Sequence, residues 1–402
     1  MFKKALVFAF CLALAAGMAA VAGEGEKKLK WFDKTEFGGD LRLRAEHFNW
    51  DDHYDDGERT RFRYRLRVGF KTAVSKNVTI GFQLRSGDPS NPHSDNQTFD
   101  TGFDKDTIAI AEAYVNWKAT DNLTVFGGKF SPKKLWHVSD MHWDDDVVTE
   151  GALESWAWNR DGAVKKVELN LYQFILEESG SGDDAYLFGG QIAPTFALND
   201  KNDLTVGFGY ETFSEPDRVV GLTFGGNLTT EPEGIVTNLI DPETGDLVSD
   251  FDVASLFAIW KNKSSEKWPV KVSLFYYQNL GAESAAGSIL EADDGMFVPI
   301  ASDLVSDEND TALYGRVQVG DYNKPGRMAF RYTRYDSKPD AMFYAWVQSD
   351  TKRGTNLEGN RVDFRVGMPK KAYINLTWYN TDWKYGDDPT MDRFQLDYIF
   401  KF

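Results

Sequence analysis

The sequence has 402 residues, of which 42% are hydrophobic and 14% aromatic, and its formal net charge at pH 7 is −17. This acidic balance disfavours nucleic acid as a partner, because binding to phosphates requires a basic surface. The aromatic content excludes a disordered protein, the single cysteine excludes a disulfide scaffold, and no stretch after the N-terminus has the roughly 20 consecutive apolar residues of a membrane-spanning helix.

The N-terminal segment has the pattern of a secretory signal peptide. Lys3 and Lys4 precede an apolar run from residue 5 to residue 21, and small residues at 20–22 provide a cleavage site. We expect residues 1–22 to be removed and residues 23–402 to form the mature chain. Cys11 lies inside the apolar run, whereas a lipid-anchored cysteine would end it. The predicted mature chain therefore has no thiol for catalysis, zinc binding or haem attachment.

The mature chain alternates between polar and apolar residues with a period of two, which indicates β-strands. The clearest case is 59–70, where arginines at every second position face one side and apolar or aromatic residues face the other. The same alternation is found in 78–85, 361–368 and 394–402. A helix would scatter the arginines around its axis, so we predict a strand for 59–70.

Sixteen strands are predicted, joined alternately by short polar turns and by long connections. Short turns on one side and long loops on the other are typical of an outer-membrane barrel, whose turns face the periplasm. The weakly alternating segment 148–158 must be a strand to keep all short turns on one side; fourteen and eighteen strands remain alternatives. The long connections are 86–106, 131–147, 214–250, 280–309 and 337–359. The predicted strands are 36–48, 59–74, 77–86, 107–119, 122–130, 148–158, 164–176, 185–198, 204–213, 251–262, 268–279, 310–321, 327–336, 360–368, 372–382 and 391–402.

The fold class that we predict is an all-β, antiparallel, up-and-down transmembrane barrel rather than a secreted β-sandwich or β-helix. The apolar faces of the strands are rich in Phe, Tyr and Trp, which suits aromatic girdles around an apolar band. Apolar or aromatic residues recur at every second position from Phe394 to the last residue, Phe402. This ending is similar to the terminal strand recognised by the bacterial barrel-assembly machinery, which we expect as a partner. Closure of the sheet satisfies every backbone amide in the bilayer.

Short motifs between residues 81 and 156 resemble those of bacterial porins, in particular the broad putative-porin family related to general-diffusion and anion-selective channels. The motifs are 81–87 (GFQLRSG), 111–117 (AEAYVNW), 127–130 (GGKF), 143–146 (WDDD) and 150–152 (EGA). The resemblance implies a barrel surrounded by lipid in the outer membrane of a Gram-negative bacterium. It also implies that the connection 131–147 folds inward as a constriction segment. A homotrimer and a monomer both remain open.

The charges suggest a pore with arginines on one wall. The segments 214–252 and 280–310 each carry a net charge of −8, so the loops hold nearly all of the acidic surplus. We hypothesise a transverse field between an arginine ladder and an acidic group on the opposite wall, because ordered charges set selectivity in wide pores. Arginine stays ionised and presents a planar fork to carboxylate or phosphate. The ladder consists of Arg42, Arg44, Arg61, Arg63, Arg65, Arg67 and Arg85. The acidic group consists of Asp144, Asp145, Asp146 and Glu150.

Other interpretations of these residues remain open. The arginines could simply solvate the lumen and pair with Asp40, Glu46 and Glu112. The three consecutive aspartates at 144–146 could bind calcium, which prefers oxygen ligands, although simple loop charge is the prediction and we expect no metal or other cofactor. The five histidines lack the tight spacing of metal ligands; His137 and His142 flank the proposed constriction and could titrate there.

Four functions compete. The leading prediction is a porin that lets small hydrophilic solutes diffuse passively through a water-filled barrel. The alternative is a substrate-specific channel, in which the same arginine ladder would select anions or acidic oligosaccharides. An outer-membrane enzyme is disfavoured because the sequence has no G-x-S-x-G motif or similar catalytic signal. A sheath for a partner such as an electron conduit is the last candidate.

Overall fold

The structure is a computed structural model that describes residues 34–50, 58–100, 102–180, 182–219, 235–241, 243–293, 296–305, 309–352, 354–385 and 390–402. The predicted signal peptide, residues 1–22, lies outside the described residues and remains a prediction. None of the helices in the described part of the chain has the length and apolar character to cross a bilayer.

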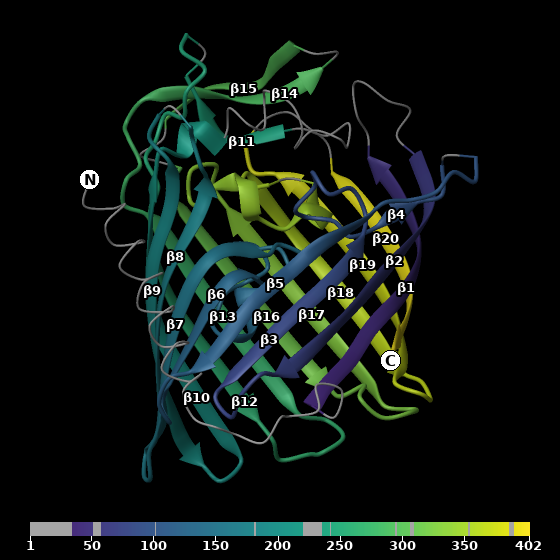
Figure 1. The fold of residues 1–402 in the computed structure, drawn as a ribbon. Helices are drawn as coiled ribbons and strands as arrows, with labels where there is room; N and C mark the ends of the chain where they lie inside the picture. Colours follow the sequence, from purple (N-terminus) through teal and green to yellow (C-terminus); the bar gives the residue numbers. More distant parts are fainter. Residues whose placement is uncertain are drawn as a thin grey trace.

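Sixteen antiparallel strands form a closed barrel, as predicted (Figure 1). Each strand pairs with its neighbours in chain order, and β1 also pairs with β20, which closes the sheet. The strand β7, on which the predicted strand count depended, is present. The strands are β1 (Thr35–Trp50), β2 (Glu58–Ala73), β3 (Val78–Ser86), β5 (Ile108–Lys118), β6 (Leu123–Phe130), β7 (Thr149–Asn159), β8 (Val164–Glu177), β9 (Ala185–Asn199), β10 (Asn202–Ser214), β12 (Asp252–Asn262), β13 (Val270–Asn279), β16 (Thr311–Gly320), β17 (Met328–Ser337), β18 (Leu357–Gly367), β19 (Ala372–Trp383) and β20 (Met391–Lys401).

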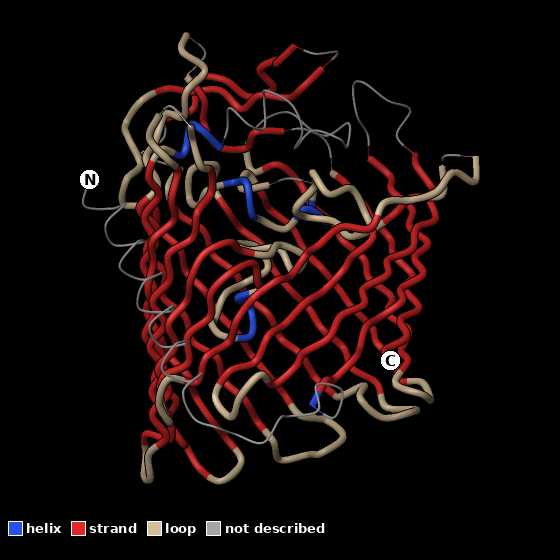
Figure 2. Tube along the Cα trace, in the orientation of Figure 1, coloured by secondary structure: helices blue, strands red, loops and turns tan. Residues whose placement is uncertain are grey.

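The connections also follow the prediction, with short turns at one end of the barrel and long loops at the other (Figure 1). The long loops contain elements that the sequence did not predict. One is β4 (Gln97–Thr98), which pairs with β2. The others form a separate three-stranded sheet at the loop end, made of β11 (Ile235–Ile240), β14 (Ala286–Asp293) and β15 (Met296–Val305). Short helical turns lie among the loops (Figure 2): η2 (Pro132–Lys134), η4 (Tyr344–Trp346) and η5 (Ser349–Thr351).

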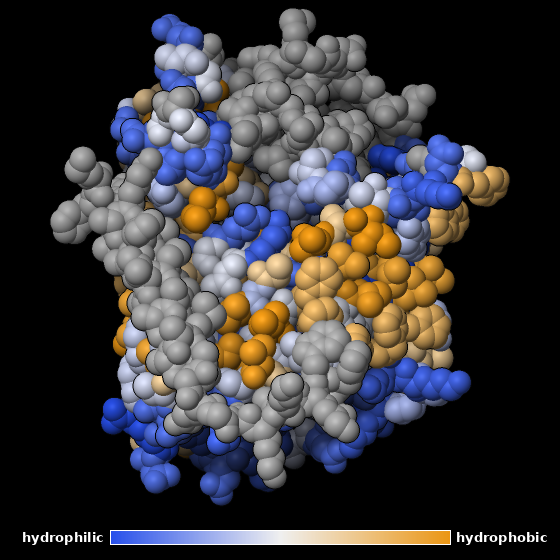
Figure 3. Space-filling view, viewed as in Figure 1, coloured by the Kyte–Doolittle hydropathy of each residue, from blue (hydrophilic) through white to orange (hydrophobic). Residues whose placement is uncertain are grey.

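The alternation of β2 shows why the chain forms this wall. Its arginines face inward, and Arg61 and Arg63 are each only 5% exposed, whereas the outward Phe62 is 57% exposed. A strand with charged residues on one face and apolar residues on the other is stable where the charged face meets the lumen and the apolar face meets lipid. Figure 3 shows apolar side chains gathered at mid-height on the outer surface and hydrophilic ones at its lower end.

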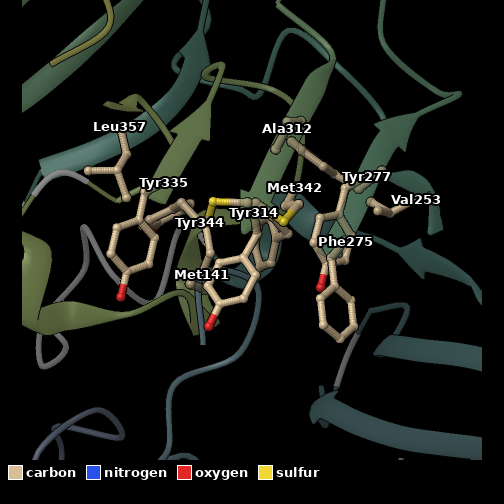
Figure 4. Close-up of a cluster of buried hydrophobic side chains, with 14 of the residues drawn as sticks. Met141, Val253, Phe275, Tyr277, Ala312, Tyr314, Tyr335, Met342, Tyr344 and Leu357 are labelled. Carbon is tan, nitrogen blue, oxygen red and sulfur yellow. The ribbon is translucent and has the colours of Figure 1, made fainter. Parts of the chain in front are cut away.

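Part of the lumen is filled by an apolar core. In one cluster, Met141, Met342 and Tyr344 come from loops and pack against wall residues such as Phe275 and Tyr314 (Figure 4). In a second cluster, loop tryptophans pack against the inner face of β5 to β9. Its members include Trp136, Trp143, Tyr114, Phe130, Leu153, Tyr172, Phe174 and Leu187. The lumen therefore has an apolar, packed part beside the part that the arginines line.

Glycines on the inner face make room for this core. A Cβ atom on Gly81 would lie 2.2 Å from the ring of Tyr114, and one on Gly189 would lie 2.2 Å from the ring of Tyr172. Each ring thus covers a glycine on the neighbouring strand, which no larger residue could replace without displacing the ring. Gly81 is the first residue of the porin-like motif 81–87.

Candidate pore and its charged lining

The arginines of the ladder lie side by side on the inner face of β1, β2 and β3. The strand register places Arg42 opposite Arg65, Arg44 opposite Arg63, and Arg67 opposite Arg85. Like charges in directly opposed positions of a sheet repel one another. The ladder is therefore stable only because carboxylates lie between the guanidinium groups.

Glu46 on β1 is the centre of one such arrangement. Its side chain is fully buried and contacts Arg61, and it accepts a hydrogen bond from Nη2 of Arg393 at 2.7 Å. Nη1 of Arg63 lies 3.5 Å from Oε1 of the same carboxylate, and Nη1 of Arg44 lies 3.9 Å from Oε2. One carboxylate is thus shared by four arginines.

Arg44 is also held by Asp397 on β20. Nε of Arg44 donates to one oxygen of Asp397 at 2.7 Å, and Nη2 donates to the other at 3.0 Å. This two-point contact fixes the plane of the guanidinium group. Arg65 donates from Nη2 at 2.6 Å and from Nε at 3.2 Å to a single oxygen of Asp40. Arg85 donates to Glu112 at 2.9 Å. The pairing with Asp40, Glu46 and Glu112 that was left open as an alternative is therefore present.

A second arginine cluster lies on β17 and β18, and the sequence reasoning missed it. Arg361 donates to both oxygens of Asp363, at 2.8 and 2.9 Å. Arg331 and Arg365 lie 3.9 Å and 3.7 Å from the same carboxylate. Alternation in 361–368 could have revealed Arg361, Asp363 and Arg365 as inward residues, because they occupy every second position of the predicted strand.

The acidic triplet does not face the ladder across an open gap. Asp146 contacts Arg67 directly, and its backbone carbonyl accepts a hydrogen bond from Arg85 at 2.8 Å. Asp144 binds the backbone N–H of Ser349 at 3.0 Å, and Asp145 contacts Lys133. Burial raises the pKa of Asp146, but Arg67 and Arg65 outweigh burial and hold it well below its usual range. Because the three carboxylates have separate partners, they do not converge as calcium ligands would. The described residues contain no cluster of His, Cys, Asp or Glu arranged to hold a metal ion.

Glu150 was wrongly predicted to face the pore. It is paired with Lys129 on the neighbouring strand, with Nζ 2.7 Å from Oε1, and its side chain is 58% exposed. Thr149 and Leu153 of the same strand are buried on the inner side. Because side chains of a strand alternate, Glu150 points outward.

The segment 131–147 contacts the inner wall at several separate places. The hydroxyl of Tyr277 on β13 accepts from the N–H of Ser139 at 3.1 Å and donates to its Oγ at 2.9 Å. Asp140 pairs with Arg316 and, at 3.4 Å, with Arg361. Burial raises the pKa of Asp140, but these two arginines hold it well below its usual range. Together with the contact between Asp146 and Arg67, these bonds connect the segment to β2, β13, β16 and β18.

The two histidines of this region have carboxylate partners on the wall. Nε2 of His142 lies 2.9 Å from Glu211 on β10, and the imidazole stacks on the ring of Tyr277. Nε2 of His137 lies 3.4 Å from Glu168 on β8. Both rings are therefore used in attaching the segment 131–147 to the wall.

A second loop, 338–356, also enters the lumen, and the sequence reasoning did not single it out. Its Trp346 accepts a hydrogen bond from the N–H of Asp144 at 2.7 Å, and its Asp350 pairs with Arg393 at 2.9 Å. The segment around β11 holds the base of this loop. Asn238 donates to the carbonyl of Met342 at 2.8 Å and accepts from the N–H of Tyr344 at 2.8 Å.

A polar cavity of about 580 Å³ lies between these two loops and the arginines. The ladder residues of β1 and β2 line one side, and Arg331, Arg361 and Arg365 line another. Asp144, Asp145 and Asp146 contribute from the segment 131–147, and residues 344–350 contribute from the second loop. Arginine is the commonest residue type in this lining.

Comparisons with known proteins agree with this architecture. Residues 53–219 match the family described as "Putative porin", and curated proteins give no match. The chain is similar to Pseudomonas putida OprB at high pH (10% identity, TM-score 0.54), with 92% of this chain and 95% of that one covered. It is also similar to Salmonella typhi OmpF in complex with daunomycin (11% identity, TM-score 0.51), with 92% and 97% covered. At such identities the likeness establishes the fold.

The predicted resemblance to bacterial porins is thereby confirmed. The porin fold and the family match over residues 53–219 support an outer-membrane channel in a Gram-negative bacterium.

Proposed function

We propose that this channel lets small hydrophilic solutes diffuse passively across the outer membrane and that its arginines give it a preference for anions. The observation that carries the proposal is the lining of the 580 Å³ cavity, in which twelve arginines and lysines face six aspartates. Glu46 and Asp363 on the wall, and Asp95 in the connection 86–106, bind several of these arginines. Counting these three acids, the cations are still in excess. Guanidinium groups between low-dielectric walls concentrate anions.

The segment 131–147 and the loop 338–356 are proposed to form the constriction together. Their contact at Asp144 and Ser349 joins them inside the lumen, and each is bound to a different part of the wall. The same contacts make the sheath for a partner protein the weaker candidate, because the loops take up space that a partner would need.

Reconstitution in planar bilayers tests the proposal. A membrane containing the purified protein should conduct, and a KCl gradient should give a reversal potential displaced toward the equilibrium potential of chloride. A displacement toward that of potassium would show that the acidic outer loops, and not the arginines, control ion passage. If these acidic segments control ion passage, high salt should weaken the displacement.

The same apparatus addresses the second candidate, a specific channel for anions or acidic oligosaccharides. A specific channel shows low conductance and saturable block by its solute, whereas a general channel conducts many small solutes. The pairing of most ladder arginines within the wall favours the general channel, because a paired guanidinium has fewer free donors for a solute.

We also propose a homotrimer. On the outer face of β7 and β8, Nε2 of Gln173 donates to Glu154 at 3.2 Å, and the outward neighbours Leu171 and Ile175 are apolar and exposed. A carboxylate on the lipid-facing side of a barrel is unfavourable, so a second copy covering this pair would remove the cost. Native mass spectrometry in detergent should detect three copies; a single copy contradicts the proposal.

A further inference from the structure

The side chain of Asp350 lies in a ring of donors that come from the barrel wall. Nη2 of Arg393 lies 2.9 Å from Oδ1, and Nε2 of Gln395 donates to the same oxygen at 3.2 Å. The hydroxyl of Tyr379 donates to Oδ2 at 3.3 Å, and Nη1 of Arg44 lies 3.5 Å from Oδ1. Two guanidinium groups, an amide and a phenol thus converge on one carboxylate.

These donors are oriented by wall residues, although Nη1 of Arg393 also donates to the backbone carbonyl of Asp350 at 2.7 Å. Arg44 is fixed by the two-point contact with Asp397, and Arg393 is fixed by Glu46 and by the ring of Phe48, 4.5 Å from its guanidinium carbon. Arg393 is 1% exposed, and Gln395 is 3% exposed. A carboxylate-binding site requires donors that neighbouring residues already hold in the right orientation.

The carboxylate, in contrast, is delivered by a loop. Asp350 belongs to η5 in the loop 338–356, and its side chain is 24% exposed. Burial raises its pKa, but Arg393 and Arg44 lower the pKa to about 2, so Asp350 is ionised at neutral pH. It lines the same 580 Å³ cavity as Arg42 and Arg365. A solute in the cavity therefore reaches the donors that hold Asp350.

We propose that Arg44, Arg393 and Gln395 form a binding site for the carboxylate of a small anionic solute, and that Asp350 is a tethered competitor for this site. The inference rests on the function proposed above and names the chemistry of its solute. A group tethered by a short loop competes with an effective concentration of the order of millimolar. Solute carboxylates at comparable concentration displace the side chain of Asp350, while the backbone carbonyls of Asp350 and Thr351 stay bonded to Arg393 and Thr381. Binding of an anion thereby removes one of the contacts that hold the second lumen loop, which contacts Asp144 through Ser349.

The test measures block of chloride current by succinate through the full chain in planar bilayers. Asp350→Ala removes the competitor and leaves the wall donors, so we expect the half-blocking concentration of succinate to fall at least tenfold. The double variant Asp350→Ala with Arg393→Gln should lose this gain. Glucose, which has no carboxylate, should block neither form.

The matched control is Asp145→Ala, which removes the same charge from the lining of the same cavity but contacts Lys133 rather than the wall donors. Its half-blocking concentration should change less than threefold. An equal gain in both single variants would show a general charge effect and overturn the inference, as would an unchanged value for Asp350→Ala. If that variant fails to fold in a heat-modifiability gel, Asp350→Asn should show the same direction of change. A wild-type protein that does not conduct would refute the proposed function rather than this site.

Discussion

Asp340 is expected to make the second lumen loop sensitive to pH. Its side chain is fully buried and accepts hydrogen bonds from the N–H of Leu239 at 2.8 Å and from Oγ of Ser249 at 2.8 Å. Burial raises the pKa of Asp340 to about 7, because the bonds from Leu239, Ser249 and Asn238 only partly compensate for the loss of hydration. The perturbation that we consider is Asp340→Asn, which keeps the shape of the protonated form and cannot ionise.

The size of the effect follows from the two pKa values of Asp340. In an open, hydrated loop its pKa is about 3.9, below the value of about 7 in the closed loop. Protonation therefore favours the closed loop. This stabilisation is complete below pH 4 and is lost as the pH rises through 7. Between pH 5 and the pKa of about 7, each pH unit destabilises the closed loop relative to the open loop by about 1.4 kcal/mol. From pH 5 to pH 8 the closed loop therefore loses about 3 kcal/mol of stability, and the equilibrium constant for opening rises on the order of a hundredfold.

Hydrogen exchange followed by mass spectrometry measures this opening. Peptides covering 235–249 and 338–352 should lose about a hundredfold of protection between pH 5 and pH 8, after correction for the intrinsic exchange rate. In Asp340→Asn the corrected protection of the peptide 235–249 should be the same at both values. The peptide 338–352 contains Ser349, whose N–H binds Asp144, and burial raises the pKa of Asp144 well above its usual range, so a pH dependence left in that peptide alone is assigned to Asp144. His93 does not contribute in this range, because burial lowers its pKa to about 4.

Two results would refute the reasoning. Equal protection at both pH values in the wild-type protein would mean that Asp340 keeps an ordinary pKa despite its burial. An equal pH dependence in Asp340→Asn would assign the effect to another group.

Three further predictions concern the pore and its assembly. Replacing Arg63 and Arg65 with Gln should move the reversal potential toward that of potassium; an unchanged potential would make the ladder a structural feature only. Tyr277→Phe removes both bonds to Ser139, each worth about 1 kcal/mol, and should speed exchange in the segment around Ser139 by about thirtyfold, whereas unaltered exchange would show that the bonds are dispensable. Phe402→Ala should lower the yield of folded barrel made in vitro with the assembly machinery, and equal yields would remove Phe402 as a recognition element.

The strands could be predicted because the two sides of the wall impose opposite chemistry on alternate residues. In β2, inward arginines alternate with outward residues such as Phe62, and the period of two is unmistakable. β7 alternates weakly because its inward Leu153 packs against the lumen core while its outward Trp156 faces lipid, so both faces are apolar. The sequence indicated this strand only indirectly, because a strand at 148–158 was needed to keep all short turns at one end of the barrel.

The candidate site was less predictable because its contacts join residues far apart in sequence. Glu46 binds Arg393, 347 positions away, and Arg44 binds Asp397, 353 positions away. The sequence shows charged residues at alternate positions of the last strand. Their partners could not be predicted, because they depend on the register between the first and last strands. The apolar run 341–346 was the available signal for the second lumen loop, since a solvent-exposed loop has no need for it.

The pairing of β1 with β20 has a consequence for biogenesis. They are the first and last strands of the barrel in chain order, and each carries half of an ion-pair network that is complete only when the two edges meet. Until that seam forms, Glu46 and Arg44 lack Arg393 and Asp397, so closure of the barrel and completion of this charged lining are one event.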